Sequence, residues 1–264
     1  MKVTIMNPDD LKDLYKLHGE VAAVCYDSDP NKAEAIGRHC SSSGHMSGSR
    51  HIYICFHIEG IDRGTTEQTL RHQIGCHVSP AYQDNYAYAN EMERWIDINP
   101  NNMMMNVRSF RYCDETQFEY YIPSTISSNE EATKIYCDTM RVINEARTKI
   151  KQNMIDRGIK DGQARQDANF LLPRATLTQF NIAFTPEALI HFCEKRLCAR
   201  AQEPIRALAK AMKDAVTEIN PRFAEELQPY CEHHLYCPEG RQTCGKAPTK
   251  DEVRAILQKN KEEA

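Results

Sequence analysis

The apolar positions of the chain change period several times, and each period predicts a type of element. Between residues 51 and 58 apolar and polar side chains alternate. The alternation predicts a strand with one buried face, made by Ile52, Ile54, Phe56 and Ile58. A second strand is predicted over residues 176–183. Residues 95–118 show few periodic cues, so we expect an irregular loop there, at an active site or a subunit contact.

Helices are predicted where a capping residue precedes apolar positions spaced three and four apart. An Asn, Asp, Ser or Thr followed by Pro, or by Glu three residues later, marks such a start. By this signal we expect helices to begin near Asn7, Asp29, Ser128, Thr185 and Thr249. The helix that follows Ser128 should end at Gly158, and another helix is predicted from about residue 204 to 219.

One short helix carries candidate chemistry. Thr65-x-x-Gln68 can form a capping box, and a helix that starts there brings Gln68, Arg71 and His72 together, because residues three and four apart are neighbours on a helix. An amide, a cation and an imidazole on one face suit an anionic ligand such as a nucleotide. The alternative is an ordinary amphipathic helix with a solvated Arg and His.

Charge and hydropathy narrow the classes of partner. The formal net charge is -4 and the pI is about 6.2, which argues against a nucleic-acid partner, because such proteins usually present a basic face. No apolar run approaches the length that spans a bilayer, and the N-terminal segment leads into polar sequence. We therefore expect no membrane partner and a cytoplasmic location, in the host cytoplasm if the protein is viral.

The chain has 11 cysteines, of which eight are scattered through predicted elements. There a free thiol behaves as a small hydrophobic group. The other three share a short C-terminal segment with two histidines, which is enough for a tetrahedral zinc site. Its predicted ligands are Cys231, His233, Cys237 and Cys244. The alternatives are chance clustering of these residues or buried free thiols.

Several segments resemble, in the same order, the flavin-dependent thymidylate synthases of the ThyX family. Arg71-His72-Gln73 follows Gln68 as the family's Arg-His-Arg motif follows a Gln. The other matching segments are Gly44-His45 through His51-Ile-Tyr-Ile, Phe118-Glu-Tyr-Tyr-Ile-Pro123, Leu171-Leu-Pro173 with Thr178, and Arg196 leading to Ala201-Gln202. The resemblance covers roughly residues 20 to 225.

The resemblance implies a fold and an activity. We expect an α+β fold with a central sheet flanked by helices, a flavin- and nucleotide-binding catalytic domain over residues 1–226, and a Cys/His-rich tail with a terminal helix over residues 227–264. The family's reaction moves a methylene group from methylenetetrahydrofolate to C5 of dUMP and reduces it with hydride from FAD, which NADPH reloads. The family builds its flavin sites between the subunits of a homotetramer, so we expect one here.

The resemblance also implies residue roles. His45 lies where the folate pterin stacks, and His45 and Arg196 take the catalytic positions. The cofactor-binding positions are Ser47, Arg71, His72, Gln73, Ile74, His191 and Gln202. The substrate-binding positions are Gln68, Ser79, Ala81, Gln83, Asn169, Arg174 and Arg196.

Departures from the family pattern fall on the substrate positions. Gln73 replaces the second Arg of the motif, and Gln83 and Asp84 replace an Arg-Tyr pair that holds the nucleotide phosphate. Ala81, or Ser79 with a gap, takes a Ser position, and Asn169 replaces an Arg that contacts the pyrimidine. Each lost charged contact costs about 1.5 to 3 kcal/mol. We therefore expect weak dUMP turnover that improves when Arg is restored at positions 83 and 169 together, unless another cation compensates, for which the candidates are Arg108, Arg111 and Arg174.

Three hypotheses stay open at this stage. The chain is a thymidylate synthase with a rebuilt phosphate site, a ThyX-like paralogue that methylates or hydroxymethylates another pyrimidine nucleotide, or a catalytically silent flavin- or nucleotide-binding protein. In the second case Asn169 could recognise a different base edge, because an amide both donates and accepts.

Overall fold

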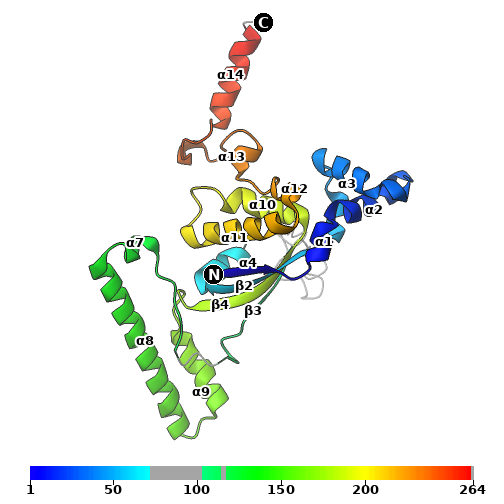
Figure 1. Cartoon of the computed structure of the whole chain (residues 1–264). Coiled ribbons are helices and arrows are strands. Elements are labelled where there is room, and N and C mark those ends of the chain that lie inside the picture. Colours follow the sequence, from blue (N-terminus) through cyan, green and yellow to red (C-terminus); the bar gives the residue numbers. More distant parts are fainter. Residues whose placement is uncertain (72–102, 114–116, 263–264) are drawn as a thin grey trace, which may run out of the picture. The chain divides into compact units, whose positions relative to one another are not determined.

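The structure is a computed structural model that describes residues 1–71, 103–113 and 117–262 (Figure 1). Its fold is α+β, as the sequence predicts. A four-stranded sheet has the order β1-β2-β4-β3, and the strands are β1 (Lys2–Ile5), β2 (Ile54–Asp62), β3 (Met103–Val107) and β4 (Leu177–Phe184).

Helices make up most of the remaining described chain. Before β3 they are α1 (Pro8–Lys12), α2 (Leu14–Tyr26), η1 (Pro30–Lys32), α3 (Ala33–Ser42), η2 (Ser47–His51) and α4 (Arg63–Leu70). Between β3 and β4 they are α7 (Ser124–Ser127), α8 (Glu130–Asp156), α9 (Asp161–Ala168) and η3 (Asn169–Leu171). After β4 they are α10 (Pro186–Arg196), α11 (Glu203–Ile219), α12 (Pro221–Ala224), α13 (Tyr230–His233), η4 (Gly240–Gln242) and α14 (Lys250–Glu262). None of the described helices is long and apolar enough to cross a bilayer.

The chain divides into two compact units. Unit 1 comprises Met1–Lys2, Ile58–Leu70 and Asn106–Asn181, and unit 2 comprises Val3–His57, Arg71–Met105 and Ile182–Ala264. The strands β2 and β4 contribute residues to both units. The division into residues 1–226 and 227–264 remains a prediction.

The predicted strands are confirmed, with small shifts of their ends. On β2, the alternating residues Ile54, Phe56 and Ile58 are buried. In unit 2 aromatic rings connect the start of β2 to the end of β4 and the end of β4 to α10: Phe56 lies 6.4 Å from Phe184, and Phe184 lies 5.3 Å from Phe192, between ring centroids. These rings form the part of the core on which α10 rests.

The helix α11 closes the core of unit 2 with one apolar face. Its buried positions recur every three or four residues, as an amphipathic helix requires, and they are Ile205, Leu208, Ala209, Met212 and Val216. The Asn220 side chain then caps α12 by accepting from the Phe223 backbone N–H at 3.0 Å, and it donates to the Leu11 carbonyl at 2.9 Å. The Asn220 side chain therefore links the junction of α11 and α12 to α1.

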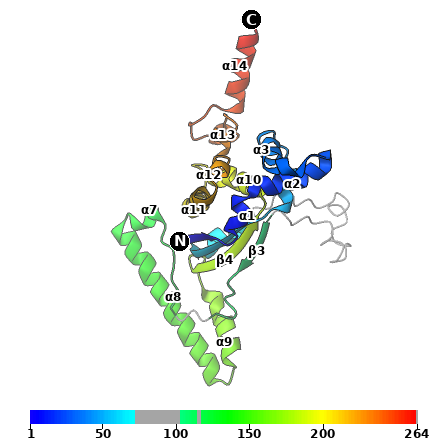
Figure 2. The same cartoon turned by 45° about the vertical axis from the view of Figure 1, so that its right-hand side comes forward.

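Two glycines set the distance between α2 and α3. A Cβ added at Gly19 would lie 1.6 Å from the Ala33 carbonyl oxygen, and one at Gly37 would lie 1.8 Å from the Tyr15 carbonyl oxygen. Any larger residue would push the two backbones apart. The helices pack side by side (Figure 2) because both contact positions lack a side chain.

In unit 1, α8 and α9 lie side by side (Figures 1 and 2). The Asn129 side chain caps α8 by accepting from the Ala132 backbone N–H at 2.9 Å, so the cap is one residue after the predicted Ser128. The end prediction is confirmed, since α8 stops at Asp156 and Gly158 has a φ of 85°.

The structure corrects three other sequence expectations. Asp62, rather than Thr65, caps α4, because its carboxylate accepts from the Thr65 N–H at 2.8 Å and from the Thr65 hydroxyl at 2.6 Å. Asn7 precedes α1 but bonds Tyr53 and Cys55 backbone groups instead of capping the helix. Residues 103–107 form the edge strand β3, so the expectation of an irregular loop is wrong there.

Candidate functional site

The start of α4 is fixed in unit 1 by backbone contacts with the segment that precedes β4. The Arg63 N–H donates to the Thr176 carbonyl and the Gly64 N–H donates to the Arg174 carbonyl, both at 3.0 Å. The first four N–H groups of a helix lack partners within it, and these two bonds satisfy two of them. The backbone of Arg63 is therefore held at a defined position at the helix start.

Arginines line a cavity of about 560 Å³ in unit 1, bounded by Arg63, Arg108, Ser109, Phe110, Arg111 and Asn169 among others. The Arg63 guanidinium lies 5.3 Å from the centroid of the Phe110 ring, and Arg111 Nε donates to Gln166 Oε1 at 2.9 Å. No Asp or Glu of the described chain lines this cavity. Three arginines in the lining of one cavity suit an anionic ligand.

Asn169 is engaged in a buried network. It is 8% exposed and lies next to Arg147, which is 2% exposed. The Asn169 carbonyl oxygen accepts from Arg147 Nη1 at 2.8 Å, and its amide nitrogen donates to the Phe110 carbonyl at 2.5 Å. Arg147 also donates to Asn144 Oδ1 at 3.1 Å. Both ends of the Asn169 amide thus bind protein groups, and the buried cation comes from α8.

The other predicted substrate residues of unit 1 lie on the surface. Gln68 is half-buried on α4. The Arg174 side chain is exposed and pairs with Glu67 at 3.3 Å. Arg71, a predicted cofactor-binding residue that belongs to unit 2, is the first residue after α4, which ends at Leu70, and it is exposed.

His45 and Ser47 occupy a tight turn in unit 2 that is built around His18. His18 is fully buried, and its Nε2 lies 3.1 Å from the His45 carbonyl oxygen. A Cβ at Gly48 would lie 2.7 Å from His18 Cδ2, so this position requires glycine. Burial lowers the pKa of His18, and the hydrogen bond with the His45 carbonyl opposes this shift in part.

The same turn packs against α10, which carries two predicted residues. Arg50 makes a two-point contact with Glu187, at 2.8 and 3.2 Å. Further along α10, burial lowers the pKa of both His191 and Arg196. The Nε atom of Arg196 is buried and has no hydrogen-bond partner among the described residues. It is therefore a free donor of the sort that a ligand oxygen satisfies.

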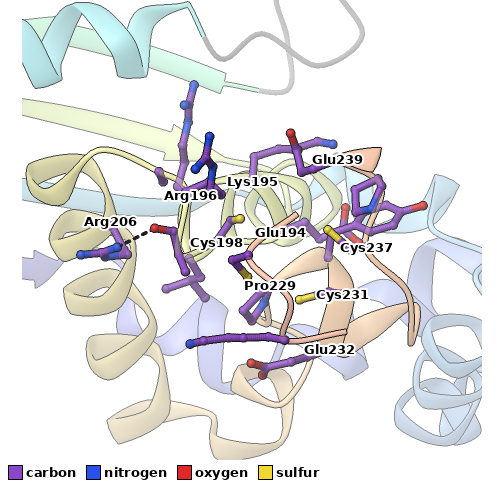
Figure 3. A pocket seen from close by; sticks show the side chains of 18 of the residues that line it. Glu194, Lys195, Arg196, Cys198, Arg206, Pro229, Cys231, Glu232, Cys237 and Glu239 are labelled. Atoms are coloured by element: carbon purple, nitrogen blue, oxygen red, sulfur yellow. Dashed lines mark hydrogen bonds between the residues drawn. The ribbon is translucent and has the colours of Figure 1, made fainter. Parts of the chain in front are cut away.

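A second cavity, of about 500 Å³, lies at the end of α10 in unit 2 (Figure 3). It is lined by Arg196, by Lys195 and Arg206, and by residues of the Cys/His-rich tail. Gln202, the residue before α11, is exposed. The lining of this cavity therefore includes both Arg196, a predicted catalytic residue, and the tail segment in which the sequence predicted a zinc site.

The predicted zinc ligands do not form the group that the sequence suggested. The potential ligand atoms within 4.8 Å of one another in the described chain belong to Glu194, His233 and His234. Glu194 is buried, and its Oε1 lies 3.0 Å from His233 Nδ1 and 2.8 Å from His234 Nε2. His233 is thus turned to this carboxylate rather than to Cys231, Cys237 and Cys244.

Six predicted residues lie outside the described part of the chain: His72, Gln73, Ile74, Ser79, Ala81 and Gln83. The sequence prediction missed Arg63, Arg147, His18 and Glu194. Arg147 gave no signal because it stands among polar residues of α8, and Glu194 sits inside a charged run. His18 shows the spacing of a core position, which marks its burial but not its contact with His45.

The chain is similar to known proteins over most of its length. The model of a family described as thymidylate synthase complementing protein matches residues 11–222. The flavin-dependent thymidylate synthase of Nitratidesulfovibrio vulgaris is 31% identical over 212 residues, which cover 80% of this chain and 75% of the relative. The enzyme of the same name from Clostridium tetani is 28% identical and covers 78% and 74%.

The fold has a solved counterpart. The crystal structure of the flavin-dependent thymidylate synthase ThyX from Helicobacter pylori, complexed with FAD and dUMP, matches with a TM-score of 0.53 and 18% identity, covering 86% of this chain and 100% of that chain. Since the family model spans residues 11–222 and a relative of 31% identity aligns over 80% of the chain, this chain belongs to the ThyX family of flavin-dependent thymidylate synthases, which confirms the resemblance seen in its motifs.

Proposed function

We propose that the protein is an FAD-dependent thymidylate synthase that converts dUMP to dTMP with methylenetetrahydrofolate as the one-carbon donor and NADPH as the reductant. The observation that carries this proposal is the cavity lined by Arg63, Arg108 and Arg111. It offers three cations to an anion, in a chain whose motif lacks the expected phosphate-binding arginine. These are therefore the compensating cations, and Arg174, which pairs with Glu67 at the surface, is not needed for that role.

The cavity also offers surfaces to a base. Phe170 is 87% exposed at its edge, and an exposed aromatic face stacks on planar rings. The guanidinium groups of Arg63 and Arg111 would hold the phosphate by charge-assisted hydrogen bonds. The hydrogen bond from Arg111 to Gln166 orders the guanidinium before the nucleotide binds, so less side-chain entropy is lost on binding. The residues of this chain orient the nucleotide, and bound FAD would supply the hydride.

Residues of unit 2 fit a flavin. The buried Arg196 Nε needs an acceptor, and flavin nucleotides carry carbonyl and phosphate oxygens. Arg71 is exposed and free to meet a phosphate, while the tight turn around Gly48 presents Ser47. A partner copy completes the site in our proposal, in which the chain forms a homotetramer; a monomer in light scattering of the flavin-loaded protein would contradict this.

The activity is tested by substrate competition. Purified protein is incubated with methylenetetrahydrofolate and NADPH and, in separate reactions, dUMP, dCMP, UMP or CMP, and the products are identified by mass. We expect dTMP from dUMP. A product from another nucleotide but not from dUMP would support the hypothesis of a paralogue with a different pyrimidine substrate. Retention of a yellow flavin without any product would support the hypothesis of a catalytically silent binding protein.

Arg71→Ala should weaken FAD binding. One lost charged phosphate contact costs about 1.5 to 3 kcal/mol, which corresponds to roughly a 10- to 150-fold rise in Kd. Flavin fluorescence titration measures this. Arg157→Ala, at an exposed arginine after α8, is the matched control and should bind FAD as the parent protein does. Equal FAD affinity in the two variants would remove Arg71 from the flavin site.

A further inference from the structure

The Cys/His-rich tail meets the end of α10 at one buried carboxylate. Glu194 lies in the last turn of α10, and its side chain is 9% exposed. Its Oε1 atom lies 3.0 Å from His233 Nδ1 and 2.8 Å from His234 Nε2. In the described chain, these three residues form the group whose potential ligand atoms all lie within 4.8 Å of one another. One carboxylate and two imidazoles are a ligand set that zinc binds in proteins.

The two adjacent histidines can converge because the helix ends between them. Neighbouring residues within a helix point about 100° apart, so they do not face one ligand. Here α13 ends at His233, and His234 is the residue after it, with φ −104° and ψ 0°. Leu235 then takes a φ of 62°, which costs about 1 to 3 kcal/mol for a residue other than glycine and persists only where the surroundings fix it. This turn brings both imidazoles to the same carboxylate.

Neighbouring side chains orient both imidazole rings. The Nε2 atom of His233 lies 3.6 Å from Glu226 Oε2. Metal-ligating histidines commonly turn their second nitrogen to a carboxylate, which fixes the tautomer and the direction of the ring. The His234 ring packs on the Tyr230 ring, with the centroids 4.1 Å apart. Both rings therefore already point at Glu194 before any ion binds.

Glu194 requires a positive charge beside it because it is buried. A buried carboxylate is costly unless it is paired. Its ion-pair partners in the described chain are His233 and His234, and an imidazole carries a charge only when it is protonated. The ammonium group of the next residue, Lys195, lies over the Tyr230 ring, 5.2 Å from the centroid. A divalent cation among the three side chains supplies the charge while both imidazoles stay neutral, the form that binds metals.

The tail also has little core of its own. Beyond Leu227, the one buried apolar residue in the described chain is Cys237, at 7% exposure. The helix α13 has four residues, too few to be stable without tertiary contacts, and it packs on α10. Short segments without a core are commonly held by a metal or a disulfide. The tail thiols Cys231, Cys237 and Cys244 are free, which leaves a metal as the link.

We propose that Glu194, His233 and His234 bind one zinc ion, which ties the C-terminal tail to the end of α10. Of the ligands expected from the sequence, only His233 is kept. Tetrahedral zinc with bonds of about 2.0 to 2.1 Å places its ligand atoms about 3.3 to 3.4 Å apart, so each nitrogen moves from Oε1 by about half an ångström. Each ring keeps one proton, on the nitrogen turned away from the ion. Water is the fourth ligand, because the two histidine side chains are 34% and 41% exposed.

The experiment uses the full chain under reducing conditions and no nucleotide or folate, so its outcome does not depend on the proposed function. Bound metal is removed with a chelator, and Zn²⁺ and Co²⁺ are titrated in separate samples. We expect saturable binding of one ion per chain, and a cobalt spectrum without a thiolate charge-transfer band. Trypsin should cut after the exposed Arg241 and Lys246 more slowly when zinc is bound. Absence of saturable binding, or a thiolate charge-transfer band, would overturn the proposal.

Ligand variants should grade the affinity. Glu194→Gln and His234→Ala should each weaken zinc binding by at least about 100-fold, and Glu226→Gln, which changes the carboxylate beyond His233, by about 10- to 100-fold. The His234 side chain is 41% exposed, so its replacement tests the proposal even if Glu194→Gln perturbs α10. Unchanged zinc affinity in His234→Ala would overturn the proposal.

Two controls separate this site from the other potential ligands of the chain. His39→Ala, at an exposed histidine of α3, should bind zinc as the parent protein does. The double variant Cys231→Ser with Cys244→Ser removes two thiols of the tail and should also bind zinc with the parent affinity. Loss of zinc binding in the double variant would place the metal at the thiols and overturn the proposal.

Discussion

Replacing Arg111 with alanine is expected to raise the KM for dUMP by roughly 10- to 150-fold, because one charge-assisted contact to the phosphate is worth about 1.5 to 3 kcal/mol. Arg111 lines the cavity of unit 1 together with Arg63 and Arg108, and Gln166 accepts a 2.9 Å hydrogen bond from its guanidinium. The contact is the same in the ground state and in the transition state, so kcat should change little.

Three further variants sharpen this result. Arg111→Lys keeps the charge but loses the planar fork, so its KM should fall between those of the parent and the alanine variant. Gln166→Leu frees the guanidinium and should raise KM less than Arg111→Ala. Arg157→Ala is the control for a change in net charge. A fall in kcat at constant KM, or an equal effect in the control, would show that the phosphate binds elsewhere.

The sequence predicted the elements well because their signals are local. Thr185 caps α10 and Thr249 caps α14 with side-chain bonds, and Glu252 returns the bond to the Thr249 N–H at 2.6 Å. The cap of α4 at Asp62 was not predicted, because Thr65 and Gln68 show a capping-box pattern that starts three residues later. The edge strand β3 was missed because Met103, Met104 and Met105 form no alternating pattern.

The site was harder to predict because its contacts join distant segments. Arg111 meets Gln166, and Arg147 meets Asn169, across more than twenty residues in each case. Neither pair has a spacing that a helix or strand period could reveal. Cys198 was missed for the same reason. From the sequence it is one of the cysteines in predicted elements, whereas in the structure it lines one cavity with the cysteines of the tail. Motif order identified the family, whereas the compensating residues became visible through packing.

Asn169→Arg is expected to destabilise the protein by about 3 kcal/mol or more, the cost of leaving a buried charge without its partner. The Arg147 guanidinium would lose its bond to the Asn169 carbonyl oxygen and face a second cation in a site that is almost closed to solvent. The Phe110 carbonyl would lose the amide that donates to it. The sequence alone favoured the opposite expectation, namely that Arg at positions 83 and 169 improves turnover.

Urea denaturation of a graded set measures this effect. Asn169→Ala removes the acceptor without adding a charge and should cost about 1.5 to 3 kcal/mol. Asn169→Asp should retain the contact with Arg147 while losing the donor to Phe110, so its loss should be smaller than that of Asn169→Arg. Asn153→Arg adds the same charge at an exposed position of α8 and should be within about 0.5 kcal/mol of the parent. If Asn169→Arg kept full stability and raised dUMP turnover, the Arg147 contact would be dispensable, and position 169 would face the nucleotide as it does in the family pattern.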